Sequence, residues 1–118
     1  MCEERGIQSE LVPGIATGFC GGMARSGNMC GAVTGAIMAI DVVLGRDAPD
    51  GPRDKDYAAV RALLDRFEGM FGSSNCGELL GCDLDTPEGR DYFKENDLAL
   101  ECRRYTEEAA RIAVSLLG

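Results

Sequence analysis

Apolar residues along most of this chain recur at steps of three and four, the spacing of one face of an α-helix. A helix that begins at Asp50 or Asp54 carries its apolar positions, before Gly72 ends it, at Tyr57, Val60, Leu63, Leu64, Phe67 and Phe71. The last helix, over 101–117, has a similar face made of Cys102, Tyr105, Ala109, Ile112, Ala113 and Leu116. No useful stretch alternates with a period of two. The pattern predicts an all-α fold, a compact bundle of about five short-to-medium helices.

A central helix rich in glycine and alanine is expected from a cap at Asn28 to Leu44, with Gly45 ending it. Its small residues recur every four positions along one side, at Gly31, Gly35 and Ala39. A stripe of this kind lets a second helix backbone approach closely. We expect the stripe to pack against another helix, in this chain or in a second copy, rather than to form a binding groove.

Capping residues mark the starts of three shorter helices. Ser9 is placed to cap a short helix over 10–19. Asn75 precedes Glu78 by three residues, which is the reciprocal capping pattern, and Thr86 precedes a proline at the first helical position.

Length and charge narrow the classes of function. The 118 residues make one α-helical domain, 1–118, with 1–8 as a polar tail. A net charge of −8 and the absence of any Lys or Arg run argue against nucleic-acid and anionic-membrane partners. The longest apolar run, 36–44, contains Asp41 and is too short to span a bilayer. The first residues lack the pattern of a signal peptide, so a cytoplasmic protein is expected.

Six cysteines and no histidine give the chain its candidate chemistry. In a reducing compartment, thiols at this density indicate redox, metal or cluster chemistry more often than permanent cross-links. The absence of histidine removes the commonest zinc ligand and the usual general base. The thiols themselves are therefore the candidate reactive groups.

Two cysteines lie at the starts of predicted helices. Cys30 follows the glycine-rich turn 18–27, Cys76 follows Asn75, and each is followed by glycine. A helix N-terminus stabilises a thiolate, so we expect a lowered pKa for at least one of them, with Cys30 favoured. A phosphate-binding loop is excluded because no strand precedes the glycines and no Lys-Ser/Thr pair ends the turn.

The remaining cysteines leave several pairings open. Cys82 lies six residues beyond Cys76, so a disulfide between them requires Gly81 to end the helix. Otherwise Cys30 and Cys102 are the candidate partners, and Cys102 points inward from the last helix. The spacings exclude a zinc ribbon. A four-thiolate site for an iron–sulfur cluster or zinc, with Cys20 as a further ligand, stays open.

Three segments carry a resemblance to a known family. They are "CGAVTG" at 30–35, "NCGELLGCDLDTPEG" at 75–89 and "ECRRYTEEAARIA" at 101–113. They resemble the redox-active protein family named for its C_GCAxxG_C_C cysteine signature. The resemblance implies a small α-helical protein that is redox active or holds an iron–sulfur or other metal centre. It places Cys30 on the central motif, Cys76 and Cys82 on the paired-cysteine segment, and Cys102 on the late cysteine.

The start of the chain departs from that family. Members usually carry an earlier helix with its own cysteine, whereas here seventeen residues precede Gly18. That helix is expected to be missing or truncated, with Cys20 or a second subunit supplying any ligand it would have provided. The apolar surface it would leave predicts a homodimer.

Three functions follow from these residues. The first is a redox module, a thiol oxidoreductase with a protein redox partner, in which Cys30 is the reactive thiolate and Cys76, Cys82 or Cys102 resolves. The second is an iron–sulfur or other metal-binding module that uses the same thiolates. The third is a structural helical dimer whose cysteines are inert.

Overall fold

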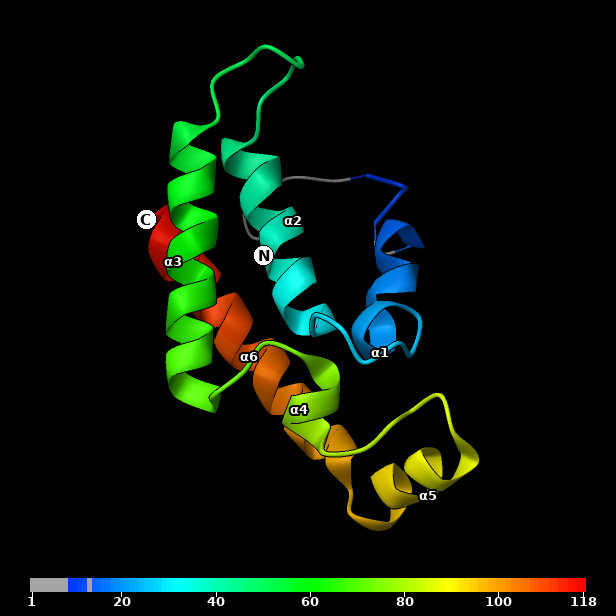
Figure 1. Cartoon of the computed structure of the whole chain (residues 1–118). Coiled ribbons are helices and arrows are strands. Elements are labelled where there is room, and N and C mark those ends of the chain that lie inside the picture. Colours follow the sequence, from blue (N-terminus) through cyan, green and yellow to red (C-terminus); the bar gives the residue numbers. More distant parts are fainter. Residues whose placement is uncertain (1–8, 13) are drawn as a thin grey trace.

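The computed structural model describes residues 9–12 and 14–118, and these form an all-α fold (Figure 1). This confirms the predicted fold class, while the polar tail 1–8 lies outside the described residues. The described elements, six α-helices and one 3-10 helix, are η2 (Gly14–Phe19), α1 (Cys20–Met23), α2 (Gly31–Leu44), α3 (Asp54–Phe71), α4 (Cys76–Leu80), α5 (Pro87–Glu95) and α6 (Leu98–Leu117).

Three long helices, α2, α3 and α6, build the core. In Figure 1, α2 and α6 run in the same direction and α3 runs opposite to both. The largest fully buried side chains come from α2 and α3 and are Val33, Ile40, Leu63 and Phe67. Burying one such side chain contributes about 1.5–3 kcal/mol, so the contact between these faces of α2 and α3 is a main source of the stability of the bundle. The prediction of α2 as a central helix agrees with its packing on α3, α6, η2 and α1.

Two of the predicted helix ends form as expected. At the end of α3, Gly72 adopts a left-handed conformation with φ of 83°, and its N–H donates to the Glu68 carbonyl at 2.8 Å. At the start of α5, the Thr86 hydroxyl accepts from the Gly89 N–H at 3.0 Å, with Pro87 in the first helical position. These local signals are self-contained, which explains why the sequence predicts them well.

The start of α2 differs from the prediction. Cys30, not Asn28, is the residue that precedes the helix. The backbone of Asn28 is engaged elsewhere, because its N–H donates to Gly22 at 2.9 Å and its carbonyl accepts from Cys76 at 2.6 Å. Asn75 does precede α4, but its side chain forms no capping bond. Pairing between the two loops replaces both expected side-chain caps.

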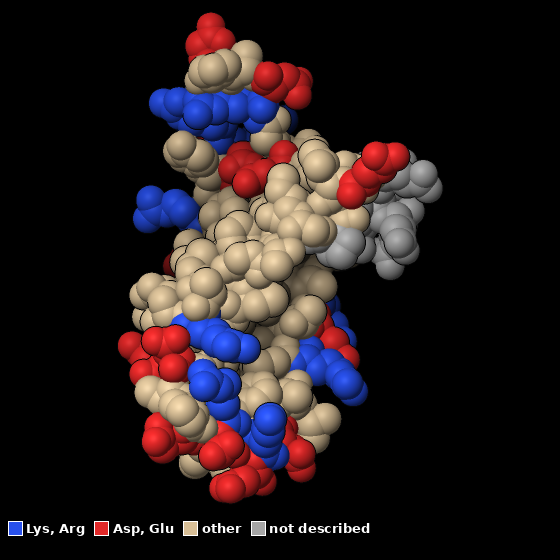
Figure 2. Space-filling view, turned by 90° about the vertical axis from the view of Figure 1, so that its right-hand side faces the viewer, with Lys and Arg blue, Asp and Glu red and all other residues tan. Residues whose placement is uncertain are grey.

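The N-terminal segment is tighter than the predicted helix over 10–19. It forms the 3-10 helix η2 and then a left-handed turn in which five consecutive residues have φ between 51° and 71°, namely Gly21, Gly22, Met23, Ala24 and Arg25. Three of these are not glycine, and each such residue costs about 1–2 kcal/mol. The turn brings the chain back so that Asn28 bonds to Gly22. Figure 2 shows this side of the molecule, where charged side chains gather at the two ends and leave uncharged surface between them.

Candidate functional site

Four cysteines from separate segments converge at one end of the helix bundle. Cys30 precedes α2, Cys76 begins α4, Cys82 follows α4, and Cys102 lies in the second turn of α6. Their charges act on one another: the Cys76 thiol is influenced by the other three, and the Cys102 thiol by Cys30 and Cys82. Cys30 and Cys76 are buried, whereas Cys82 and Cys102 are half-buried. The structure thus brings together all four thiols that the sequence singled out.

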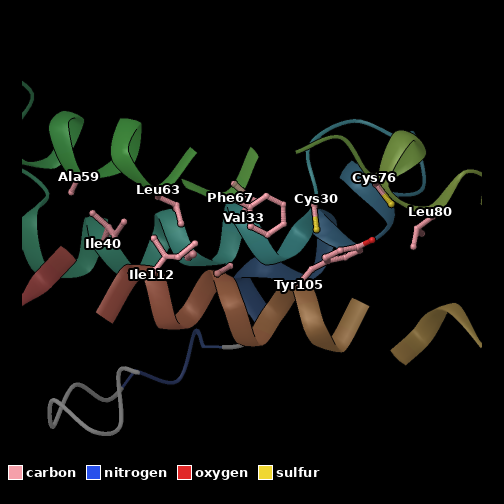
Figure 3. Packing of buried hydrophobic residues seen from close by; sticks show 13 residues of the cluster. Cys30, Val33, Ile40, Ala59, Leu63, Phe67, Cys76, Leu80, Tyr105 and Ile112 are labelled. Atoms are coloured by element: carbon pink, nitrogen blue, oxygen red, sulfur yellow. The ribbon is translucent and has the colours of Figure 1, made fainter. Parts of the chain in front are cut away.

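A short antiparallel pairing positions Cys30 and Cys76. Met29 and Asn75 form an isolated bridge between the two loops. On either side of it, the Cys30 N–H donates to the Ser74 carbonyl at 2.7 Å and the Cys76 N–H donates to the Asn28 carbonyl at 2.6 Å. Alternate residues of such a pairing point to the same side. Both thiols consequently face the core above Tyr105 (Figure 3).

Gly22 is a structural requirement of this site that the sequence reasoning missed. A Cβ atom at this position would lie 2.7 Å from the Cys76 Cβ and 2.5 Å from the Asn28 carbonyl oxygen. Its φ of +66° also belongs to the region that favours glycine. The consecutive glycines Gly21 and Gly22 were the sequence feature that could have indicated this requirement. Gly22 allows the left-handed turn to pack directly on Cys76.

Tyr105 is the second residue whose place in the site the sequence did not reveal. Its hydroxyl donates to the Leu79 carbonyl at 3.2 Å and so ties α4 to α6. Its ring packs edge-on against Phe71 and Phe67, with centroid distances of 4.9 and 6.1 Å. Burial raises the pKa of its hydroxyl, and the charges of Glu101, Cys102 and Cys30 add to that shift. Apolar periodicity placed Tyr105 on the buried face of α6 but said nothing about its hydroxyl.

Burial raises the pKa of three of the thiols. It raises the pKa of Cys76 to about 11, with smaller contributions from the charges of Cys30, Cys102 and Cys82. Burial is also the main cause of the raised pKa of Cys82 and of Cys102, assisted by Asp83 and by Cys30 respectively. The expectation of a lowered pKa is therefore wrong for Cys76. The N–H groups of Cys76 and Gly77 already donate to Asn28 and Gly27, and a helix of five residues offers little dipole.

A cavity of about 560 Å³ opens beside the thiols. Residues of η2, α1, α2, α4, α5 and α6 line it. Cys30, Cys76 and Cys102 contribute to the wall, the exposed Cys20 also lines it, and Cys82 does not.

The small-residue stripe of α2 meets two different surroundings. At Gly31 a Cβ would lie 2.9 Å from the Phe19 carbonyl oxygen, so the N-terminal segment packs closely there. Gly35 has no atom near its Cβ position and, together with Ala39, lines the cavity. The expected close packing thus holds at the first position of the stripe, and the next two positions border open space.

The turn expected between Cys76 and Cys82 is present. Gly81 ends α4 in a left-handed conformation with φ of 67°. The five cysteines that the structure describes, including both members of this pair, are nevertheless free thiols. A permanent cross-link is therefore not what holds this end of the bundle together.

The thiols as placed do not form a metal-ligand set. Within 9–12 and 14–118, no group of three or more Cys, Asp, Glu or His side chains is arranged to hold a metal ion. The iron–sulfur and zinc alternatives therefore gain no support from the donor arrangement. Separately, no helix in the described part of the chain is long and apolar enough to cross a membrane.

Comparison with known proteins gives one family and one relative. A family model described as "Putative redox-active protein (C_GCAxxG_C_C)" matches residues 1–116. A protein of Archaeoglobus fulgidus, described as "Uncharacterized protein", is 30% identical over an alignment that covers 60% of this chain and 52% of that protein. The chain thus spans about half the length of this curated relative. No solved structure matches the chain.

Proposed function

The chain belongs to the C_GCAxxG_C_C redox-active family, and from that premise we propose that it is a thiol–disulfide redox protein. One observation carries the proposal: thiols from separate elements, Cys30 before α2 and Cys102 on α6, line one and the same cavity. Two thiols that can approach each other beside a cavity form a disulfide when they give up two electrons and two protons. The reacting pair in this proposal is Cys30 and Cys102.

The choice of Cys102 over Cys76 rests on the loop pairing. Cys30 and Cys76 lie on the same side of the Met29–Asn75 bridge, but diagonally across it. Diagonal neighbours in such a pairing are about 7–8 Å apart, whereas disulfides need Cα atoms within about 4.4–6.8 Å. A bond between Cys30 and Cys76 would require backbone movement. The charge of Cys30 acts on the thiol of Cys102 and on that of Cys76 alike, so the geometry of the loop pairing decides between the two pairs.

Cys30 is the attacking thiol in this mechanism. It occupies the residue before α2, where a developing thiolate faces the positive end of a 14-residue helix. The thiolate bonds to one sulfur of a substrate disulfide and displaces the other sulfur, which takes up a proton. The Cys102 thiol then loses its proton, bonds to Cys30 and releases the second substrate sulfur. The protein ends as a disulfide and the substrate as a dithiol.

This reaction makes the protein a thiol oxidoreductase that works in a reducing compartment, such as the cytoplasm. A dithiol protein then acts as the redox partner that restores the reduced form. Burial raises the pKa of the Cys76 thiol to about 11 and raises that of Cys82 as well, which disfavours either as the first attacking thiolate. They support the site without taking the first step.

Peptide mapping of oxidised protein tests the proposal. Protein purified without reductant is oxidised with a neutral small disulfide, trapped with an alkylating agent and digested. We expect a peptide pair joined through Cys30 and Cys102, and its loss in Cys30→Ser and in Cys102→Ser. Cys20→Ser is the matched control, because Cys20 also lines the cavity but is exposed.

Two results would contradict this function. One is oxidised protein in which all thiols stay free. The other is stoichiometric iron or zinc that blocks alkylation until a chelator removes it, because the thiolates would then serve as metal ligands.

A further inference from the structure

The cavity beside the thiols has the size and wall of a small-molecule site. Its volume of about 560 Å³ falls within the roughly 300–1,000 Å³ typical of ligand pockets. Apart from the thiols, the wall is built mainly from small residues and larger apolar side chains, among them Ala36, Ala110, Leu80 and Phe93. A wall of this kind favours an apolar ligand, because a polar ligand would lose its hydration without replacement.

The cavity wall also lacks charge in a protein that carries many charges. No Asp, Glu, Lys or Arg is among the described residues that line it, although the net charge of the chain is −8. The hydroxyl of Thr106 is already used, since it donates to the Cys102 carbonyl at 2.9 Å. Charged disulfides such as oxidised glutathione would therefore find no partner for their carboxylates.

An extended protein segment is also a poor occupant. Its backbone N–H and C=O groups need hydrogen-bond partners when they leave water. The apolar wall around Gly35 and Ala36 supplies none from its side chains. The attacking thiol Cys30 is moreover buried, so a substrate must enter the cavity to reach it.

From this wall and these thiols we infer that the substrate is a neutral, apolar small-molecule disulfide, represented by a 1,2-dithiolane on an aliphatic chain. The inference rests on the proposed thiol–disulfide function and names the substrate class of the same site. The ring lies beside Cys30 and Cys102, and the aliphatic chain lies along the small-residue stripe at Gly35 and Ala39.

The exchange needs no further reactant. Cys30 bonds to one ring sulfur, the ring S–S bond breaks, and the freed ring sulfur is protonated. Cys102 then bonds to Cys30 and displaces the second ring sulfur, which takes up the second proton. The ligand gains two electrons and two protons, and the protein loses the same number. The reverse reaction oxidises the ligand dithiol.

The test compares two neutral disulfides on the intact protein. Lipoamide has an apolar chain and a dithiolane ring, whereas hydroxyethyl disulfide is small and polar. Reduced protein is mixed with each, and oxidised protein with each corresponding thiol, so that neither direction is missed. The readout is the rate at which the Cys30–Cys102 peptide pair appears or disappears. We expect the lipoamide reaction to saturate with concentration and the hydroxyethyl disulfide reaction to stay linear.

A cavity-filling variant separates the ligand from the thiol chemistry. Gly35 has open space at its Cβ position, so Gly35→Leu places a side chain in the cavity. We expect Gly35→Leu to lower the rate of the lipoamide reaction at least tenfold and the rate of the hydroxyethyl disulfide reaction less than twofold. Gly69→Leu is the matched control, because Gly69 is an exposed helical glycine that also has open space. It should change neither rate.

The outcomes distinguish the two proposals. If neither disulfide produces the Cys30–Cys102 pair, the proposed function fails. If both produce it without saturation, or if Gly35→Leu leaves the lipoamide rate unchanged, the function stands and the substrate inference is overturned. A dimer that Gly35→Leu dissociates, combined with no lipoamide saturation, would assign the cavity to a second copy of the chain and also overturn the inference.

Discussion

Gly22 lies where the left-handed turn packs against Cys76, and the structure leaves no space there for a side chain. Gly22→Ala should destabilise the protein by roughly 3 kcal/mol, because it combines an unfavourable φ with a clash against Asn28 and Cys76. Urea denaturation followed by circular dichroism measures the change. Gly18→Ala is the control, since a Cβ at Gly18 meets nothing within 4 Å and should shift stability by less than about 0.5 kcal/mol. Equal stability of the two variants would contradict the described contact.

Cys76 should be among the slowest thiols to alkylate. Because burial raises its pKa to about 11, its thiolate fraction should rise about tenfold for each pH unit between pH 7 and 9. In urea-unfolded protein the thiolate fraction of the same cysteine should level off once the pH exceeds the ordinary cysteine pKa of about 8.5. Iodoacetamide labelling, quantified for each peptide by mass spectrometry, measures both profiles. A plateau below pH 9 in folded protein would contradict the buried, protonated thiol.

The sequence predicted the reacting residue types but only part of their environment. Cys30 and Cys76 do lie at helix starts, as the glycine and asparagine signals indicated. The expected thiolate stabilisation fails at Cys76 because its amide pairs with a loop 48 positions earlier in the chain, at Asn28. Local spacing cannot report such a partner. It also cannot report that Gly22 touches Cys76, since their contact depends on five left-handed residues in succession.

At the scale of elements, a pair of carboxyl groups links α2 to α3 at the end opposite the thiols. Asp41 on α2 and Asp56 on α3 line one small cavity together, and the pKa of Asp41 is raised to about 6. Burial is the main cause, followed by the Asp56 side chain, which favours the protonated form of Asp41 by hydrogen bonding and by its charge. Oδ2 of Asp56 is buried without a hydrogen-bond partner. The pair therefore holds the two helices best when one proton is shared.

This pair predicts a fall in stability as the pH rises. The folded protein binds the Asp41 proton more tightly than the unfolded chain does, because the pKa of an aspartate in an unfolded chain is about 3.9. The stabilising contribution is complete below pH 4 and is lost as the pH passes through 6. We expect Asp41→Asn to raise the Tm at pH 7.5 and to leave it nearly unchanged at pH 4.5. Thermal melts at both values test this, with Asp47→Asn in the neighbouring loop as the control. A larger effect at pH 4.5 would contradict the shared proton.

Element boundaries were predictable where a local signal decides them. Thr86 and Pro87 start α5, and Gly72 ends α3, because each bond lies within a few residues of its partner. The helix expected from Asn28 begins later, because the N–H of Asn28 is bonded to Gly22 and its carbonyl to Cys76, so its backbone does not take part in the helix. The carboxyl pair was invisible for the same reason, because Asp41 and Asp56 meet only after α2 packs on α3.

For the whole molecule, we propose a homodimer. The N-terminal segment exposes a cluster of large apolar side chains, each more than half accessible, at Leu11, Val12 and Ile15. Association would remove such a patch from water. Light scattering at micromolar concentration should give twice the chain mass, and Ile15→Asp should reduce it towards one chain. Val42→Asp is the control, because Val42 is similarly exposed on α2. A monomer mass for the unaltered protein would contradict the dimer.

The all-α class was predictable from the sequence because apolar residues recur at helical spacing in α3 and α6 and no stretch alternates with a period of two. The cavity was not, because it forms between small residues of α2 and α6 and an N-terminal segment that turns back over them. The small residues Gly31 and Gly35 predicted close packing, but the structure shows it only at Gly31, where the Phe19 backbone approaches.

The distance along the chain between Cys30 and Cys102 has a thermodynamic consequence. A bond between them closes a loop of about 70 residues, which removes conformational entropy from the unfolded chain worth about 4 kcal/mol. By linkage, the folded state favours disulfide formation by the same free energy that the disulfide lends to folding. Oxidation would then form a reversible cross-link between the start of α2 and α6. A protease that cleaves only the opened chain would degrade the reduced protein faster than the oxidised protein, and cellular lifetime would report its redox state.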